Sequence, residues 1–384
     1  MIKKLCLIAV ISVTAIFMLI NKTDAKIEET RGIFISYLEY KKYLSNKNEK
    51  EIIKEVEKIV TSLKKYHINT IYLQVRMFSD SIYNSKIFPF TDIIDNNKKN
   101  NIDLLSIFLK YAKKEKIKIY AWINPYRISS STNIDNVPKN SPAYIYINTN
   151  HVDIIEDKGI YFNPASSIVK NLIIAGVLEI IENYDVDGIM FDDYFYPSKT
   201  IDLKNYEEYK NIMSIDEYRL GQVNELIQRV YKTIKSINKN IEFGISPDGN
   251  IENNYEYIYA DVNEWLSKEG YIDFIMPQLY YGFYNEAKPF IKTVNEWNSL
   301  IKNNTKLIVA LSLYKSGNVD AYAKKGMDEW LNNTDIIKRQ IEYSRTLSHY
   351  DGYSLFRYEY LVDYKNSYLD KEIDNYLNFI NKEK

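Results

Sequence analysis

The sequence is poor in the residues that build thiol and metal sites. Among its 384 residues there are one cysteine and three histidines. Cys6 lies in an apolar N-terminal segment, so the rest of the chain offers no disulfide, thiol nucleophile or zinc-thiolate site. His67, His151 and His349 are far apart, and none has a ligand-like neighbour three or four residues away. We therefore expect no metal site and no cofactor.

Glycine is also scarce, and so is any excess of charge. The 12 glycines form neither a Gly-x-Ser-x-Gly elbow nor a Gly-x-Gly-x-x-Gly turn, which argues against a serine triad and a nucleotide site. The 50 basic and 51 acidic residues leave a formal net charge of -1. Without a basic surface field, nucleic acid is not an expected partner.

Tyrosine, by contrast, is abundant, with 36 residues. Lys, Ile and Asn are common too, which is typical of codon bias in an AT-rich genome. The functional alternative is a groove lined with rings that stack on sugars, and both explanations are compatible. Hydrophobic residues make up 46% of the chain, enough for a large folded core.

The N-terminus has the pattern of a targeting segment. Lys3 and Lys4 precede an apolar run over 5–20, and the sequence turns polar over 21–25. Because a membrane span needs about 20 apolar residues, we predict a signal peptide over 1–26, with an uncleaved anchor as the alternative. The predicted protein is exported, reaches a membrane only through this segment, and folds as one domain over 27–384.

Short apolar runs rich in β-branched residues alternate with longer amphipathic stretches through the rest of the chain. The predicted strands are 32–37, 69–75, 117–123, 187–192, 241–246, 272–278, 306–312 and 351–356. The predicted helices are 49–66, 101–115, 165–183, 215–237, 288–302, 334–348 and 369–381. This alternation predicts an α/β fold, a (β/α)8 TIM barrel. A doubly wound open sheet is the rival, and the lack of a glycine-rich turn weakens it.

Long connections follow the second, third and seventh predicted strands, at about 77–100, 124–163 and 313–333. In a TIM barrel these connections lie at the C-terminal face, where barrel enzymes build their active sites. Polar and aromatic residues also gather at the ends of the predicted strands. We therefore expect the functional site among the long loops of that face.

Alternation along the strands sorts these residues by face. Met190 and Asp192 share one face of the fourth predicted strand, which we expect to point to the barrel axis. Asp193 then points outward unless the strand ends before it, which argues against the two aspartates being the acid–base pair. The same alternation groups Gln74 with Arg76, and Trp122 with Asn124 and Tyr126.

Carboxylates at the strand ends indicate acid–base chemistry. Hydrolysis of a glycosidic bond uses two carboxylic groups, one of them a proton donor with a raised pKa. Asp192 is our candidate for one of them, and its structural alternative is an ion pair with Arg76 or Arg127. The second carboxylate stays open among Glu39, Asp80, Asp193, Asp248 and Glu359. The catalytic candidates are Asp192, Asp193, Asp248 and Glu359.

Further residues at the strand ends are candidates for binding a substrate. Arginines suit an anionic group or a catalytic carboxylate, rings suit sugar faces, and amides suit hydroxyl or acetamido groups. Ion pairs, core packing and loop capping are the structural alternatives. The binding candidates are Arg76, Asp80, Trp122, Asn124, Tyr126, Arg127, Tyr194, Tyr196, Gln278 and Tyr280.

Seven segments between Arg31 and Glu359 together resemble the glycosyl-hydrolase-like family 10 proteins of bacteria. They are RGIFISYLEY, NTIYLQVRMFSDSIYNSKIFPF, AWINPYR, YFNPA, VDGIMFDDYFYP, FGISP and IDFIMPQLYYG. The resemblance implies an exported TIM-barrel glycosidase acting on a bacterial glycan, with peptidoglycan strands as the leading substrate. The family pattern falls on Arg76, Asp80, Asn124, Tyr126, Arg127, Asp192, Asp193, Tyr196 and Gln278.

The sequence departs from related patterns at several positions. Asp248 follows a proline where an apolar or small residue is usual, and Met77 stands where proline is common. Against the D-G-x-D-x-D-x-E string of chitinase-like barrels, Met190 replaces an aspartate and Tyr194 the glutamate, so those positions do not support a substrate-assisted mechanism. Two other hypotheses remain: a barrel that binds cell-wall glycan without cleaving it, and a metal-assisted hydrolase.

Overall fold

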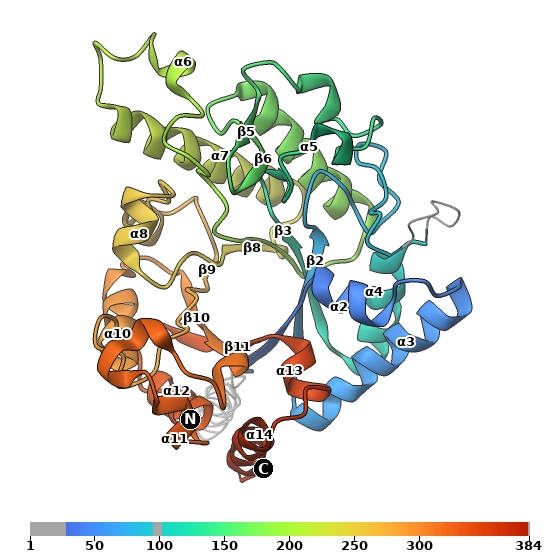
Figure 1. Cartoon of the computed structure of the whole chain (residues 1–384), viewed down its shortest axis with the longest axis vertical. Helices are drawn as coiled ribbons and strands as arrows, with labels where there is room; N and C mark the ends of the chain where they lie inside the picture. The colour runs from blue at the N-terminus through green and yellow to red at the C-terminus, as the bar shows by residue number, and fades with distance from the viewer. Residues whose placement is uncertain (1–27, 95–101, 383–384) are drawn as a thin grey trace, which may run out of the picture.

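The computed structural model describes residues 28–94 and 102–382. Eight parallel strands close into a barrel, with helices around it (Figure 1). The strands are β1 (Thr30–Ile35), β2 (Thr70–Arg76), β3 (Lys118–Ile123), β7 (Gly188–Phe191), β8 (Glu242–Ile245), β9 (Phe274–Ile275), β10 (Lys306–Ser312) and β11 (Tyr350–Phe356). The predicted TIM barrel is therefore confirmed, and the predicted leader over 1–26, with Cys6, lies outside the described residues.

All seven predicted helices are present, each within a few residues of its expected ends. They are α3 (Glu49–Ser62), α4 (Leu104–Glu115), α5 (Ser167–Asn183), α7 (Ile215–Ile237), α10 (Phe290–Leu300), α12 (Ile336–Ser344) and α14 (Ser367–Asn381). Local sequence sets where they begin. At α3, the Asn48 side chain accepts from the Glu51 backbone N–H, and the Glu51 carboxylate accepts from the Asn48 backbone N–H, which is a capping box. No helix in the described parts of the chain is long and apolar enough to span a membrane.

The barrel interior is filled by large side chains, several of them aromatic. The inner cluster contains Phe34, Tyr72, Tyr120, Trp122, Met190, Phe274, Met276, Ile308 and Ala310. Glycines on neighbouring strands make room for these rings. A Cβ atom added at Gly188 would lie 2.4 Å from the Tyr120 ring, and one at Gly244 would lie 2.4 Å from the Phe274 ring. Because the interior is packed solid, a ligand can enter only above this layer.

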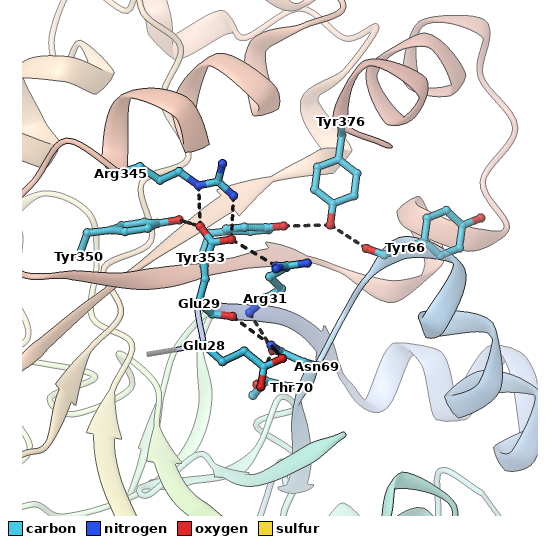
Figure 2. Close-up of polar contacts among 10 residues, drawn as sticks. All are labelled: Glu28, Glu29, Arg31, Tyr66, Asn69, Thr70, Arg345, Tyr350, Tyr353 and Tyr376. Atoms are coloured by element: carbon cyan, nitrogen blue, oxygen red, sulfur yellow. Dashed lines mark hydrogen bonds and ion pairs between the residues drawn. The ribbon is translucent and has the colours of Figure 1, made fainter. Parts of the chain in front are cut away.

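The chain enters the barrel through a polar cluster at its N-terminal face, shown in Figure 2. The Glu29 carboxylate accepts hydrogen bonds from Arg345 at 2.7 Å, from the Tyr350 hydroxyl at 2.8 Å and from Arg31 at 3.2 Å. Although burial opposes it, the hydrogen bonds from Arg345 and Tyr350 hold the pKa of Glu29 below its ordinary value. This cluster ties the start of β1 to the segment that links α12 to β11.

The last helix, α14, is joined to the same face. The Tyr376 hydroxyl lies 2.9 Å from the Tyr353 hydroxyl and donates to the Tyr66 carbonyl at 2.7 Å (Figure 2). Glu372, fully buried on the same helix, accepts from the Ile337 backbone N–H at 2.6 Å. The helix therefore closes the ring between the first and last β/α units, on the face away from the long loops.

The long connection after the third barrel strand, predicted at 124–163, contains a small antiparallel sheet that was not predicted from the sequence. Its strands are β4 (Arg127–Ser129), β5 (Val152–Ile155) and β6 (Gly159–Phe162), in the order β4-β6-β5. The Asn163 side chain donates to the Asn150 carbonyl at 2.8 Å and to Asn205 at 2.9 Å, fixing the base of the excursion. As a result, Arg127 projects from ordered structure rather than from a loose loop.

Candidate active site

A cavity of about 260 Å³ lies at the carboxyl ends of the barrel strands. Most strands contribute to it from the residues at or just after their ends. Its lining includes Ser36 after β1, Gln74 from β2, Trp122 from β3, Asp192 after β7, Ser246 after β8, Gln278 after β9 and Phe356 from β11. The cavity is therefore where the fold class predicts an active site.

Asp192 is the buried acid of this cavity, with 3% of its surface exposed. The Trp122 indole Nε1 donates to its Oδ2 at 2.8 Å, and the Tyr194 backbone N–H lies 3.4 Å from its Oδ1. Burial and the adjacent Asp193 charge raise the pKa of Asp192 well above its ordinary value, against the opposing effect of the Trp122 bond. This shift favours the protonated carboxyl of Asp192, the form that a proton donor requires.

Asp193 lines the same cavity and is half-buried. Strand β7 ends at Phe191, so the strict alternation of faces stops before Asp193 and the side chain turns inward. This is the exception foreseen for a strand that ends before Asp193, and the outward orientation expected for a continuing strand does not apply. Burial and the nearby Asp248 charge raise the pKa of Asp193 to about 6, while a hydrogen bond from Gln278 opposes the shift. At neutral pH Asp193 is therefore mostly ionised.

The other two catalytic candidates do not line the cavity. Asp248 accepts from the Asn250 backbone N–H at 2.7 Å and from the Asn253 amide at 3.2 Å, at the start of α8 (Ile251–Glu256). Glu359 is ion-paired to Lys42 at 2.9 Å and to Arg357 at 2.8 Å. These bonds occupy both carboxylates, so a catalytic role for either remains a prediction without geometric support.

Glu39, a further candidate for the second carboxylate, lies behind the cavity wall. Its Oε2 accepts from the Ser36 backbone N–H at 2.9 Å and from the Ser36 hydroxyl at 2.7 Å. Its Oε1 forms a buried ion pair with Arg357. Glu39 therefore completes the capping box of α2 (Tyr37–Tyr43) and holds the cavity residue Ser36 in place.

Six of the predicted binding residues do line the cavity: Trp122, Asn124, Arg127, Tyr194, Gln278 and Tyr280. The Arg127 guanidinium lies between two rings, 5.2 Å from that of Phe78 and 5.1 Å from that of Tyr194. Its Nε is buried and, within the described residues, has no hydrogen-bond partner. The Asn124 side chain accepts from the Arg127 backbone N–H at 3.2 Å, so it orients this arginine as well as facing the cavity.

Aromatic rings after β9 and at the end of β11 form another wall of the cavity. The Tyr280 ring lies 5.5 Å from the Phe356 ring and 5.9 Å from that of Tyr314, which stands outside the cavity lining. Burial raises the pKa of the Tyr280 hydroxyl, so this group stays protonated and can donate a hydrogen bond. This wall offers the flat apolar surface on which sugar rings stack.

Arg76 does not share the cavity with Gln74, contrary to the alternation expected for that strand. The pairing of β2 with β3 shifts register between the two residues, which turns Arg76 to the outside of the barrel. There its guanidinium lies 3.6 Å from the centre of the Phe88 ring and packs against Gly176 of α5. Arg76 therefore joins β2, its loop and α5, and it does not reach Asp192.

The remaining binding candidates also lie outside the cavity. Asp80 lines a neighbouring hollow of about 220 Å³, where burial raises its pKa to about 6 against the effect of a hydrogen bond from Thr91. Tyr126 is fully buried in the outer core, because β3 ends before it and the alternation no longer applies. Tyr196 packs against the Tyr259 ring at 5.1 Å.

The sequence reasoning missed the residues that β1, the start of α2 and β11 contribute to the cavity. They are Phe34, Ser36, Tyr37, Leu38 and Phe356. Alternation was available as a signal, because Phe34 and Ser36 share the inward parity of the first strand. Phe34, Ser36, Leu38 and Phe356 were overlooked because apolar and small side chains carry no chemical signature of their own.

Within residues 28–94 and 102–382, no group of His, Cys, Asp and Glu is placed to hold a metal ion. The site instead holds a carboxyl group with a strongly raised pKa and a second carboxyl group beside aromatic and amide side chains, at the C-terminal face of a TIM barrel. That combination is typical of glycoside hydrolases, and this is the class to which the protein belongs.

The chain belongs to the glycosyl hydrolase-like 10 family, whose sequence model matches residues 29–328. It is 31% identical to glycosyl hydrolase DigH of Escherichia coli O6:H1 over 331 residues, which are 78% of this chain and 74% of that protein. It is 28% identical to glycosyl hydrolase YngK of Bacillus subtilis, over 81% of this chain and 64% of the relative.

Among solved structures, the fold is similar to the glycoside hydrolase domain of PgaB (BpsB) from Bordetella bronchiseptica. The TM-score is 0.57, with coverage of 91% of this chain and 98% of that domain. Because the sequences are only 13% identical, this likeness supports the barrel fold alone.

Proposed function

We propose that the protein is an exported glycoside hydrolase that cleaves glycosidic bonds within peptidoglycan strands, with Asp192 as the proton donor. The observation that carries the proposal is the pairing of two unlike carboxyl groups in one cavity. Burial raises the pKa of Asp192 well above its ordinary value and so favours its protonated form, whereas Asp193 has a pKa of about 6 and is ionised at neutral pH. This chemistry needs one carboxyl group as the proton donor and another as the anion, and two groups in such different environments suit these two roles.

In the proposed reaction, the Asp192 carboxyl proton passes to the bridging oxygen as the bond from that oxygen to the sugar C1 breaks. Positive charge develops on the sugar ring, and the ionised Asp193 lies beside it. The Trp122 N–H holds the Asp192 carboxyl and favours the anion left after proton transfer. The Tyr280 ring wall provides a stacking surface for the sugar.

The cell-wall assignment is supported by Arg127 and by the N-terminal sequence. Peptidoglycan contains muramic acid residues, each carrying a lactyl group whose free carboxylate is exposed once the stem peptide is removed. Arg127 lines the cavity, and its Nε, which has no hydrogen-bond partner in the part of the chain that the structure describes, suits such an anion. A signal-peptide pattern over 1–26 agrees with a substrate outside the cytoplasm.

The test is to incubate the 27–384 protein with purified peptidoglycan, both intact and stripped of stem peptides, beside an Asp192→Asn variant. We expect sugar fragments by mass spectrometry from the wild type, and a loss of about 100- to 10,000-fold in the variant, which keeps the shape of Asp192 but has no proton to donate. The new reducing end identifies the bond. Binding by both proteins without any release would replace this proposal with the non-catalytic glycan-binding barrel.

A further inference from the structure

We infer that cleavage is substrate-assisted: the 2-acetamido oxygen of the sugar attacks C1, and Asp193 orients that group, which makes the enzyme specific for N-acetylated hexosamines. This inference rests on the proposed function and adds the nucleophile, which that function leaves open. In the sequence, Met190 and Tyr194 did not support a substrate-assisted mechanism. The structure changes this conclusion, because it brings Asp193, rather than residue 194, into the cavity with Asp192 as the second carboxylate.

The first argument is that both cavity carboxylates come from one wall. Asp192 and Asp193 are consecutive residues after β7, and neighbouring Cα atoms are only ~3.8 Å apart. Within the described residues, the rest of the cavity lining is neutral apart from Arg127. The walls across from β7 are formed by the ends of β1 and β11, with Phe34, Ser36 and Phe356.

Catalysis by two enzyme carboxylates requires a different arrangement. A retaining enzyme places its nucleophile on the face of the sugar opposite the leaving group, and an inverting enzyme places a base there to activate water. The other candidates for the second carboxylate, Glu39, Asp80, Asp248 and Glu359, all lie outside the cavity lining. Each is already bound to protein donors: Glu39 to Ser36, Asp80 to the Phe78 backbone N–H, Asp248 to Asn250 and Glu359 to Lys42.

An acetamido group on the substrate supplies the missing nucleophile. Asp192 donates its proton to the bridging oxygen while the acetamido carbonyl oxygen forms a bond to C1, and the bond from C1 to the bridging oxygen breaks. The sugar becomes an oxazolinium ion, whose positive charge faces ionised Asp193. Asp193 accepts a hydrogen bond from the acetamido N–H, which orients the group and makes its oxygen more nucleophilic.

In the second step water attacks C1 from the side that the leaving group has vacated. The water proton goes to the Asp192 carboxylate, the bond from C1 to the acetamido oxygen breaks, and the acetamido group is restored. The sum is hydrolysis with retained configuration at C1, and water is the only co-reactant. Asp192 ends the cycle protonated, as it began.

The contacts of Asp193 fit this positioning role. Gln278 donates a hydrogen bond to Asp193, and its Nε2 also donates to the Ser246 carbonyl at 3.1 Å. The amide is thereby tied to β8 and fixes the direction of the Asp193 carboxylate. Asp192 is separately held by Trp122. The two aspartates therefore have independent supports and can carry different roles, one toward the bridging oxygen and one toward the acetamido group.

The experiment compares glycan strands that are fully N-acetylated with the same strands after chemical N-deacetylation, and adds a thiazoline analogue of the oxazoline as inhibitor. We expect at least 100-fold faster cleavage of the acetylated glycan, competitive inhibition by the thiazoline, and retained configuration by NMR of the first product. Asp193→Asn should lose both rate and thiazoline affinity. Asp185→Asn, at a side chain that is 91% exposed, is the matched control.

The outcomes separate the two proposals. Equal cleavage of both glycans without thiazoline inhibition, or a product of inverted configuration, would overturn the substrate-assisted mechanism and leave the hydrolase intact. Failure to cleave any peptidoglycan preparation would overturn both. Circular dichroism and thermal melting of Asp193→Asn distinguish lost chemistry from a lost fold, and thiazoline binding measured by calorimetry reports the site without turnover.

Discussion

At the scale of single residues, the most informative feature is that Asp192 and Asp193 have unlike surroundings although they are adjacent in sequence. Asp192 is enclosed and bonded to an indole N–H, whereas Asp193 is half-buried and bonded to an amide. Burial raises the pKa of both, and their mutual repulsion further separates the two protonation steps. The pair therefore takes up its two protons in separate steps, Asp192 being the group that holds its proton to higher pH.

This state predicts a bell-shaped dependence of kcat/KM on pH. Activity requires ionised Asp193, so it should fall as pH drops below about 6, where Asp193 gains a proton. It also requires protonated Asp192, so it should fall again at higher pH, as that group loses its proton. The measurement is kcat/KM between pH 4 and about 9 on one glycan substrate. Asp193→Asn should abolish the acidic limb of its residual activity, and an acidic limb that persists unchanged would assign it to another group.

At the scale of elements, the close approach of α5 to β2 depends on one glycine. A Cβ atom at Gly176 would lie 2.3 Å from Arg76 Nη1 and 2.8 Å from the Phe88 ring. Because Arg76 is fully buried, it has little room to move. Gly176→Ala should therefore lower the free energy of unfolding by about 1–3 kcal/mol, measured by urea denaturation.

Gly221 in the middle of α7 is the matched control for this prediction, since nothing lies within 4 Å of a Cβ placed there. Gly221→Ala should raise the free energy of unfolding by about 0.5–1 kcal/mol, because alanine loses less conformational entropy in a helix. If the two variants changed stability in the same direction, overpacking at Gly176 would not explain its effect.

Elements were also where sequence reasoning worked best and where it first failed. Periodicity located every barrel strand and the seven main helices, because each buries one regular face. It failed where regularity breaks: Arg76 leaves its expected face through a register shift, and Tyr126 and Asp193 lie past the ends of their strands. The sheet of β4, β5 and β6 was missed because its strands have only three or four residues each.

At the scale of the whole molecule, the strand count and the loop lengths were sufficient to predict the barrel and the face that bears the site. They did not predict which of the polar residues at that face meet in the cavity. Asp192, Arg127 and Gln278 do so, whereas Asp248 and Glu359 turn to local caps and ion pairs. Whether a side chain enters the cavity depends on the residue at which its strand ends, because one residue more or less turns the side chain to the other face. Composition and spacing do not encode that end point.

The stability of the whole molecule should respond to pH, because burial raises the pKa of several carboxyl groups. Glu372 of α14 is the one outside the active site with the clearest effect: burial raises its pKa from 4.5 to about 7, although a hydrogen bond from the Ile337 N–H opposes the shift. A carboxyl pKa raised by folding gives stability that is fully present below the unfolded value. That stability is lost as pH rises through the folded value.

Ionisation of Glu372 should therefore lower the free energy of unfolding of the wild type by up to ~3 kcal/mol as pH rises from about 5 to 8. Each unit of pKa shift corresponds to about 1.4 kcal/mol. Glu372→Gln keeps an acceptor oxygen for Ile337 but has no proton to lose, so it should gain stability relative to the wild type over that range. Urea denaturation at both ends of the range measures the difference. Asp374→Asn, at an exposed position on the same helix, is the control and should follow the wild type. A constant difference between Glu372→Gln and the wild type would show that the ionisation of this residue is not coupled to the docking of α14.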